Sequence, residues 1–173
     1  MIDAPKKGRL HGFVVKNRAA LLGTSAATAI GLAGYTIQFH EGTVYKVYRD
    51  PVGIATYCTG ETANPRLGHV YTQQECDDLL HSREWSFNKD IDRCVKRQPI
   101  RVGIRVAFLN SIYNMGPGTF CASSMVRLYN EGREREACDA LAKYVYARGK
   151  VWLRGLFLRR EDMIEVCYAG IPD

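Results

Sequence analysis

The sequence predicts an α+β protein in which helices dominate and a small strand-containing lobe precedes most of them. Its 173 residues are 46% hydrophobic, which suits one well-buried core and is too little chain for two large domains. Turn-forming residues are concentrated in residues 50–70, separated by β-branched and aromatic residues: Pro51, Gly53, Gly60, Pro65 and Gly68. This stretch predicts a hairpin-like lobe, and helical patterns fill the chain after it.

An uncharged run occupies residues 19–39, directly after a basic tail that contains Lys6, Lys7, Arg9, Lys16 and Arg18. As one helix, the run would span roughly 31 Å at about 1.5 Å per residue, which is enough to cross a bilayer. Flanking basic residues would hold the amino-terminal end in the cytoplasm. The run has six Ala and three Gly against five Leu or Ile, so it predicts a marginal membrane anchor.

Two other interpretations of residues 19–39 stay open. One is a cleaved secretory signal, for which Ala27, Thr28 and Ala29 supply the small residues of a cleavage point. The other is an ordinary buried helix of the domain. We favour the anchor, so the predicted organisation is a tail and membrane segment at 1–39 followed by a folded domain at 40–173.

Local patterns predict the helices that follow the lobe. Thr72 and Glu75 form a capping-box pattern that opens a helix toward Asp90. Pro99 starts the next predicted helix, which ends at Gly116. Its apolar face consists of Ile100, Ile104, Ala107, Phe108, Ser111, Ile112 and Met115. Shorter helices are predicted at 119–130, 134–147 and 157–168.

The six cysteines form an even set spread through the chain after residue 57: Cys58, Cys76, Cys94, Cys121, Cys138 and Cys167. They lack the close spacing of a metal site, and His40 and His69 have no partner pattern for a metal, so neither a metal nor a cofactor is expected. The cysteines predict three disulfides in an oxidising compartment, with 15 possible connectivities. Six buried thiols in a reducing cytosol are the alternative.

The net charge of +6 and the pI near 9.1 favour an anionic partner: nucleic acid, an acidic lipid surface or a polyanionic cell wall. Nucleic acid is the least favoured, because the basic residues lack a helix-turn-helix or aromatic framework. The basic residues between Lys143 and Arg160 could face the carboxylates of a cell wall or an anionic membrane, or they could form a solvated helix face. Trp85 and Trp152 are expected to pack in the core or at the edge of a cleft, in preference to the alternative that they stack on sugar rings.

Glu41, Asp50 and Thr56 surround a predicted Pro-Gly turn and could form an active site. Cleavage of a glycosidic bond needs a protonated carboxylic acid at the leaving oxygen and a second carboxylate that activates water or stabilises the oxocarbenium-like centre. Glu41 and Asp50 are the right residue types, and the Thr56 hydroxyl could position the water. Taken alone, the spacing is also compatible with ordinary polar residues on a surface loop.

Three motifs resemble the phage-type lysozymes of glycoside hydrolase family 24. The stretch EGTVYKVYRDPVGIATYCTGET is similar to the family's catalytic segment. NMGPG, from Asn114 to Gly118, is similar to the turn after its central helix, and ARGKVWLRGLFLRREDMIEVC is similar to its carboxy-terminal pattern. The resemblance covers residues 38–168 and implies a lysozyme-like fold with a small β lobe and a larger helical lobe.

The resemblance also implies roles for particular residues. Glu41 would be the general acid, Asp50 would align or activate water, and Thr56 would be the second anchor of that water. Arg159 or Arg160 would pair with Glu41, and Tyr48 and Asn114 would bind substrate or support the site. The implied disulfides join Cys58 to Cys76 and Cys138 to Cys167, with Cys94 and Cys121 as the remaining pair.

The implied activity is that of a monomeric endolysin, a muramidase that cuts the β-1,4 bond between N-acetylmuramic acid and N-acetylglucosamine in bacterial peptidoglycan. A lytic transglycosylase and a non-catalytic binding module are the alternatives. Residues 19–39 resemble a signal-arrest-release segment, which tethers an inactive enzyme to the host inner membrane before it enters the periplasm. This segment has no cysteine, so inactivity is expected from displaced geometry. Release would let the segment pack on the domain and bring Glu41 into place.

Overall fold

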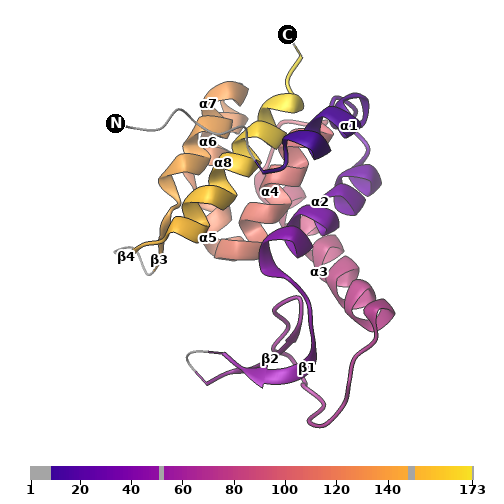
Figure 1. The fold of residues 1–173 in the computed structure, drawn as a ribbon. Helices are drawn as coiled ribbons and strands as arrows, with labels where there is room; N and C mark the ends of the chain where they lie inside the picture. Colours follow the sequence, from indigo (N-terminus) through magenta and orange to yellow (C-terminus); the bar gives the residue numbers. More distant parts are fainter. Residues whose placement is uncertain (1–8, 51–52, 148–150, 173) are drawn as a thin grey trace.

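The computed structural model describes residues 9–50, 53–147 and 151–172, which fold into a helical lobe and a β lobe (Figure 1). The helices are α1 (His11–Leu21), α2 (Ala26–Glu41), α3 (Gln73–Cys94), α4 (Val102–Met115), α5 (Pro117–Cys121), α6 (Ser124–Asn130), α7 (Glu134–Asp139), the 3₁₀ helix η1 (Ala140–Lys143) and α8 (Arg154–Ala169). The strands are β1 (Val44–Arg49), β2 (Ala55–Cys58), β3 (Tyr146–Ala147) and β4 (Val151–Trp152). The predicted class, α+β and mainly helical, is confirmed.

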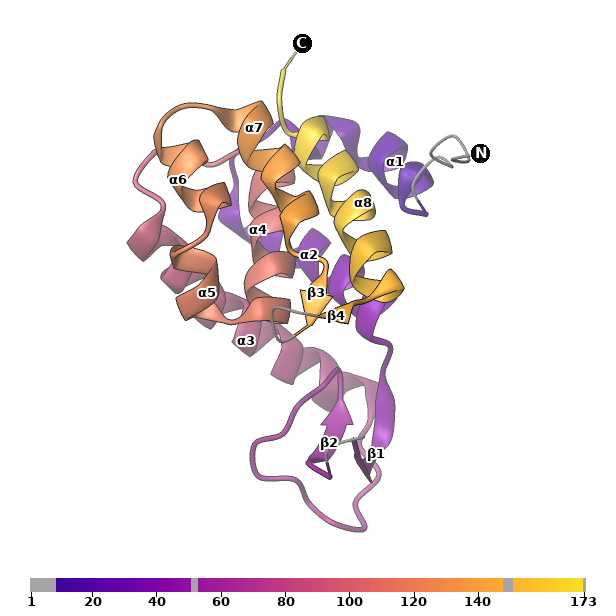
Figure 2. The same ribbon diagram turned by 90° about the vertical axis from the view of Figure 1, so that its left-hand side faces the viewer.

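Helix α4 forms the centre of the helical lobe, with α2, α3 and α8 packed around it (Figure 2). The sequence predicts one apolar face for this helix, but every residue from Val102 to Ile112 is buried. Close packing against α8 depends on two glycines: a Cβ on Gly103 would lie 2.6 Å from the carbonyl oxygen of Val166 and 2.7 Å from the backbone nitrogen of Gly170. The central position of α4 therefore requires a residue without a side chain at Gly103.

Observed helix boundaries follow the local capping patterns in part. The Thr72–Glu75 capping box is confirmed and opens α3, which continues to Cys94. The helix predicted from Pro99 begins at Val102 and ends, as predicted, before Gly116. The helix predicted at 119–130 is two helices, because Ser123 caps a new start at α6, and the one predicted at 134–147 leaves helical structure after η1. The last helix begins at Arg154 and not at 157.

Residues 19–39 do not form one continuous helix in this structure. They contain the end of α1, a turn and most of α2, and the Ser25 hydroxyl caps α2 by accepting a hydrogen bond from the Thr28 N–H at 3.2 Å. One side of the segment is buried in the main core through Leu21, Ala29, Ile30, Ala33 and Ile37. Within the described parts of the chain, no helix has the length and apolar character needed to cross a membrane.

This packing is the arrangement expected of a buried helix and also of a tethered segment after release. The division into a segment at 1–39 and a domain at 40–173 stays a prediction about the protein at a membrane. Lys6 and Lys7 of the basic tail lie outside the described residues.

The β lobe is an antiparallel hairpin of β1 and β2 in which Tyr48 pairs with Thr56. Two links join it to the helical lobe: Tyr113 of α4 donates a hydrogen bond to the carbonyl of Thr59, and Arg83 of α3 forms an ion pair with Glu61 at 2.5 Å. These contacts hold the hairpin in front of α3 and the end of α4. Pro51 of the predicted turn lies outside the described residues.

Three disulfides reinforce the fold: Cys58–Cys76, Cys94–Cys121 and Cys138–Cys167. They are the pairs that the family resemblance implies. The first ties β2 to α3, the second ties α3 to α5, and the third ties α7 to α8. Each therefore connects elements that flank the central helix or the β lobe.

Candidate active site

Glu41 is the last residue of α2, at the point where the chain leaves the helical lobe for the β lobe. Gly42 ends the helix with a φ of 72°, a left-handed conformation that residues with a side chain rarely adopt. Its N–H donates to the carbonyl of Gln38 at 2.8 Å, which closes the final turn. The carboxylate of Glu41 is thereby presented at the end of a rigid helix, and its side chain remains 30% exposed.

Arg159 of α8 holds this carboxylate. Its Nη2 donates to Oε1 of Glu41 at 2.6 Å, and the Arg159 side chain is only 7% exposed. A charge-assisted hydrogen bond from a buried guanidinium fixes the orientation of the carboxylate far better than an exposed ion pair would. The sequence left Arg159 and Arg160 as alternatives, and the structure selects Arg159.

Arg160 contacts other parts of the same wall. Its Nη2 donates to Oδ1 of Asn114 at 2.6 Å, and its Nε donates to the carbonyl of Tyr144 at 3.0 Å. Burial, with a contribution from Arg159, lowers the pKa of Arg160 to about 10. Arg160 therefore links α8 to the end of α4 and to the residue after η1, which places Asn114 beside Glu41.

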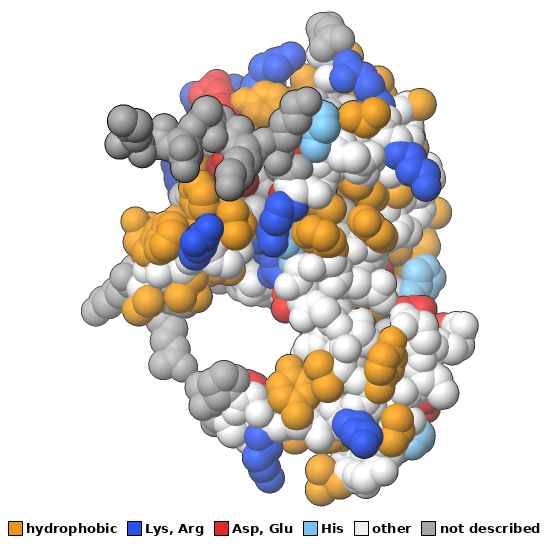
Figure 3. All heavy atoms as spheres, viewed as in Figure 1, with side chains coloured by type: hydrophobic (Ala, Val, Ile, Leu, Met, Phe, Trp, Pro, Cys, Tyr) orange, Lys and Arg blue, Asp and Glu red, His pale blue; other side chains and the backbone are white. Residues whose placement is uncertain are grey.

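Glu41 lines a hollow of about 430 Å³. Its other lining residues come from the start of α8, the end of α4, the residue before Glu41 and the amino-terminal side of α1: Arg9, His40, Asn114, Leu153, Arg154, Gly155, Leu156 and Arg159. Figure 3 shows that the molecule is also hollowed between the helical lobe and the β lobe. Glu41 thus lies on the wall of a hollow at the end of the helical lobe from which the chain passes to the β lobe.

Asp50 and Thr56 belong to the β lobe and are connected through the backbone of Ile54. Oδ1 of Asp50 accepts from the Ile54 N–H at 2.8 Å, and the Thr56 hydroxyl donates to the Ile54 carbonyl at 3.0 Å. Because the hydroxyl proton of Thr56 is used in this bond, its lone pairs are oriented to accept a hydrogen bond, for example from water. Thr56 is buried, whereas Tyr48, its strand partner, is exposed.

Sequence reasoning missed a charged cluster behind Glu41. Asp162 of α8 is buried, and it accepts hydrogen bonds from the backbone N–H of Arg9 at 2.9 Å and from the Arg9 guanidinium at 2.7 Å and 3.1 Å. Nε2 of His40 lies 3.8 Å from the same carboxylate, and Nδ1 of His40 lies 3.4 Å from Nη2 of Arg9. Spacing along the chain could not reveal this cluster, because 153 residues separate Arg9 from Asp162.

The cluster keeps His40 uncharged. Burial, followed by the charges of Arg159, Arg9 and Arg160, lowers the pKa of His40 to about 3. A guanidinium can only donate, so Nδ1 of His40 is the acceptor and its proton is on Nε2, facing Asp162. Burial also raises the pKa of Asp162, against the opposite effect of Arg9.

The aromatic and basic residues singled out in the sequence have different positions. Trp85 is exposed on α3, so packing in the core is wrong for it, and Trp152 is exposed on β4 beside Leu153, which fits the edge of a cleft. Figure 3 shows hydrophobic side chains gathered over the β3–β4 region. The basic residues between 143 and 160 do not form one solvated face, since Arg159 and Arg160 are buried, and Arg148 and Lys150 lie outside the described residues.

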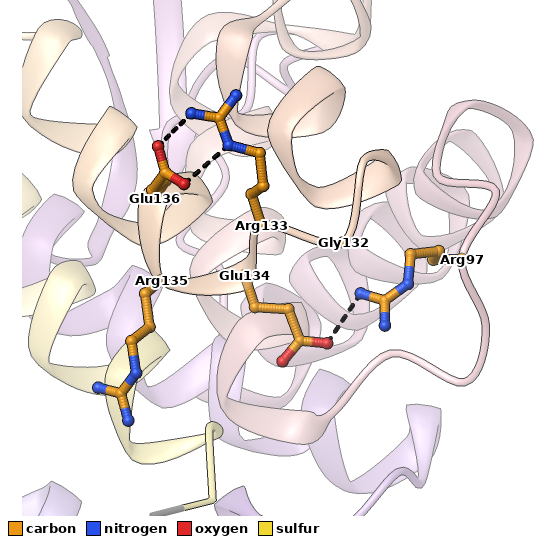
Figure 4. A pocket seen from close by; sticks show the side chains of 6 residues that line it. All are labelled: Arg97, Gly132, Arg133, Glu134, Arg135 and Glu136. Carbon is orange, nitrogen blue, oxygen red and sulfur yellow. Dashed lines mark hydrogen bonds and ion pairs between the residues drawn. The ribbon is translucent and has the colours of Figure 1, made fainter.

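A second hollow, of about 540 Å³, is formed where α7 begins (Figure 4). Four of its charged residues form two ion pairs, Arg97 with Glu134 at 3.0 Å and Arg133 with Glu136, and the fifth, Arg135, lies over the ring of Tyr168. Exposed ion pairs of this kind are common and contribute little to stability. Among the described residues, no cluster of potential metal ligands is found either here or beside Glu41.

Comparison with known proteins finds matches over the part of the chain that contains Glu41, Asp50, Thr56 and Arg159. The profile of the phage lysozyme family matches residues 38–163. The SAR-endolysin of Bacteriophage PS119 is 38% identical over 131 residues, covering 75% of this chain and 77% of the relative. The SAR-endolysin of Escherichia phage Mu is 33% identical over 158 residues, covering 88% and 91%. The solved active form of the P1 phage endolysin Lyz superposes with a TM-score of 0.72 at 22% identity, covering 91% of this chain and 90% of that one.

Proposed function

This chain belongs to the phage lysozyme family, and we propose that Glu41 is the general acid with which it cuts bacterial peptidoglycan. The protein is a muramidase of the endolysin type, and its relatives favour this activity over the transglycosylase and binding-module alternatives. The observation that supports the role of Glu41 is its carboxylate on the wall of the hollow, held by Arg159 at 2.6 Å. Because Arg159 occupies Oε1, proton delivery to the glycosidic oxygen is assigned to Oε2.

Asp50 and Thr56 are proposed to act on water. The shared contact with Ile54 fixes the two side chains relative to each other. A water that donates to the Thr56 hydroxyl and to the Asp50 carboxylate would present a lone pair to the sugar carbon as Glu41 protonates the leaving oxygen. Tyr48 and Asn114 are assigned to the contact with the glycan, from opposite lobes.

The first test compares Glu41→Gln with the intact chain on purified peptidoglycan. Gln has nearly the shape of Glu and can still accept from Arg159, but it cannot deliver a proton. We expect a loss of activity of about 100-fold to 10,000-fold. Glu136→Gln, a change of the same type on an exposed residue of α7, is the matched control and should stay active. Substantial lysis by Glu41→Gln would remove Glu41 from the mechanism.

The products identify the reaction. A hydrolase leaves a reducing N-acetylmuramic acid, whereas a transglycosylase leaves an anhydro sugar, and mass spectrometry of the muropeptides separates the two. Asp50→Asn provides an independent check, because a hydrolase needs the Asp50 carboxylate to activate water, whereas a transglycosylase uses no attacking water and does not need it. Full activity of Asp50→Asn together with anhydro products would contradict the hydrolytic mechanism.

Residues 19–39 are proposed to tether the protein to the host inner membrane before release into the periplasm. The absence of charge in the segment, the basic tail before it and the endolysin relatives support this proposal. Inserted as one membrane helix, the segment would hold Glu41 at the membrane surface, away from Asp50 and Thr56. In the folded structure the same residues belong to two helices of the core. The protein would thus exchange one environment for the other.

The test of the tether uses positions that are exposed in the folded structure. Thr28 and Gly31 are exposed on α2, and a Cβ on Gly31 would meet no atom within 4 Å. Thr28→Leu with Gly31→Leu should therefore favour the membrane, by a few tenths of a kcal/mol per residue, without disturbing the core. Thr28→Gln with Gly31→Gln is the matched opposite change.

We expect the Leu variant to remain in the membrane fraction and to lyse cells late, and the Gln variant to be released early. If both variants fractionate and lyse like the unmodified chain, the tether is wrong. We also propose that the released enzyme is a monomer, because one chain supplies Glu41, Arg159 and the hollow around them. Sedimentation of the released protein tests that state.

A further inference from the structure

Arg9 lines the same hollow as Glu41, although it precedes the uncharged segment. Its guanidinium and its backbone N–H both bind Asp162, whose side chain is 2% exposed. The guanidinium also lies over the ring of Phe39, 5.3 Å from its centre, and beside His40. Arg9 therefore holds the final turn of α2, which ends in Glu41, against α8.

Asp162 would disturb the orientation of Glu41 if it lost the guanidinium of Arg9. It lies three residues after Arg159 on α8, and residues three apart on a helix are neighbours on one face. Arg159 is the guanidinium that holds Glu41. Without the Arg9 side chain, the buried carboxylate would keep the backbone N–H groups of Arg9 and Leu10 but would have no cation, and the cation on the same face of its own helix is Arg159. Without Arg9, Asp162 would therefore compete with Glu41 for Arg159.

We infer that Arg9 is a positioning residue for Glu41: by occupying Asp162 it leaves Arg159 free to orient the carboxylate of Glu41. This inference rests on the proposed role of Glu41. It also gives the amino-terminal tail a part in the site. In the tethered state Arg9 lies on the cytoplasmic side of residues 19–39, and Glu41 lies on the other side. The site is then complete only after the tail itself has crossed to the side of the catalytic lobe.

The experiment uses the full-length, purified, membrane-free protein acting on purified peptidoglycan, so that the outcome does not depend on tethering. Arg9→Ala should lower kcat roughly ten- to hundredfold with little change in KM, because a carboxylate that is displaced by about 1 Å loses catalytic power. Lys16→Ala removes the same charge from an exposed residue of α1 and should keep the activity of the unmodified chain.

A second substitution separates positioning from a merely structural role. In Arg9→Ala with Asp162→Asn, the competing carboxylate is absent, so Arg159 should return to Glu41 and kcat should recover to within a few-fold of the unmodified chain. Arg9→Lys should retain part of the activity, because Lys keeps the charge but not the paired hydrogen bonds. Loss of structure alone would give a double variant no more active than Arg9→Ala, and that result would overturn the inference.

Activity of Arg9→Ala equal to that of the unmodified chain would also overturn it. If Glu41→Gln is inactive in the same assay, that failure concerns Arg9 alone. An active Glu41→Gln would instead overturn the proposed function itself. Circular dichroism of each variant shows whether it is folded. The expected pattern is a folded Arg9→Ala variant with lowered kcat and a folded double variant with recovered kcat.

Discussion

Glu84 of α3 should make the stability of the protein fall as the pH rises through neutrality. Its side chain is packed against α2, where a Cβ on Gly34 would lie 3.2 Å from Oε2 of Glu84. Glu84 is 2% exposed, and burial raises its pKa from 4.5 to about 8. The titratable groups around it are Asp77, Asp78 and His81 of α3, Tyr35 of α2 and Tyr113 of α4. None of these is a nearby cation that would hold Glu84 ionised.

The sign and size of the effect follow from the two pKa values of Glu84. Below pH 4.5 the carboxyl is protonated in both the folded and the unfolded state and contributes nothing. Between 4.5 and about 8 only the unfolded state ionises, so the free energy of unfolding falls by about 1.4 kcal/mol per pH unit. At pH 7 the accumulated loss is about 3 kcal/mol, a large part of the 5–15 kcal/mol that is typical of a domain.

Denaturant unfolding of the unmodified chain and of Glu84→Gln at pH 5, 6, 7 and 8 tests this reasoning. Gln cannot ionise, so the variant should gain about 1.4 kcal/mol relative to the unmodified chain with each pH unit from 5 to 7, and less from 7 to 8, where the folded carboxyl of Glu84 begins to ionise. Other titrating groups, His40 included, are shared by the two proteins and cancel in the difference. Glu131→Gln is the control, since its Arg partners lower the pKa of Glu131 and it is already ionised throughout this range. A difference between Glu84→Gln and the unmodified chain that does not change with pH would refute the argument.

The remaining predictions concern packing, acid stability and a disulfide. Gly103→Ala should lower the free energy of unfolding by about 1–3 kcal/mol or more, because its Cβ would meet a backbone atom at 2.6 Å. Gly31→Ala should raise the free energy of unfolding by about 0.5–1 kcal/mol, because Ala favours a helix over Gly and its Cβ would meet no atom within 4 Å. Denaturant unfolding measures both. Because the pKa of His40 is lowered from 6.5 to about 3, only the unfolded state takes up this proton at pH 5, and the free energy of unfolding should fall by about 2 kcal/mol. His40→Gln should therefore lose less stability than the unmodified chain between pH 6.5 and 4. Replacing both Cys138 and Cys167 by Ala should cost about 3–4 kcal/mol, as expected for the loop of 29 residues that they close; equal thermal unfolding of both proteins would contradict this.

Much of the fold could be predicted from local sequence patterns. The capping box at Thr72 and Glu75 and the helix end at Gly116 are where the sequence places them, because a cap is satisfied by residues within one turn of the chain. Other boundaries were wrong where a nearby residue competes. Ser123 starts a new helix inside the range predicted as one helix, since its hydroxyl can cap the N–H of Val126. The catalytic candidates could be predicted from the sequence because Glu41, Asp50 and Thr56 lie close together along the chain.

Residues 19–39 show where local pattern stops being sufficient. Their composition is compatible with one membrane helix in lipid and with two shorter helices in a protein core. In the folded structure, Ser25 caps the second helix and Ile30, Ala33 and Ile37 face the core. Whether the segment forms one helix or two depends on whether lipid or the protein core covers its apolar side. The local sequence does not determine which of the two covers it.

The sequence by itself determined the helix-dominated class, the small β lobe and the carboxylate expected to carry the chemistry, because each depends on residues that are neighbours along the chain. Only the tertiary structure decided which arginine holds Glu41 and what lies behind it. Arg159 and Arg160 are adjacent, yet consecutive residues of a helix point about 100° apart, so the packing of α8 against α4 directs one to Glu41 and the other to Asn114. Arg9 reaches Asp162 across 153 residues, a contact that exists only when α1 and α8 are packed together.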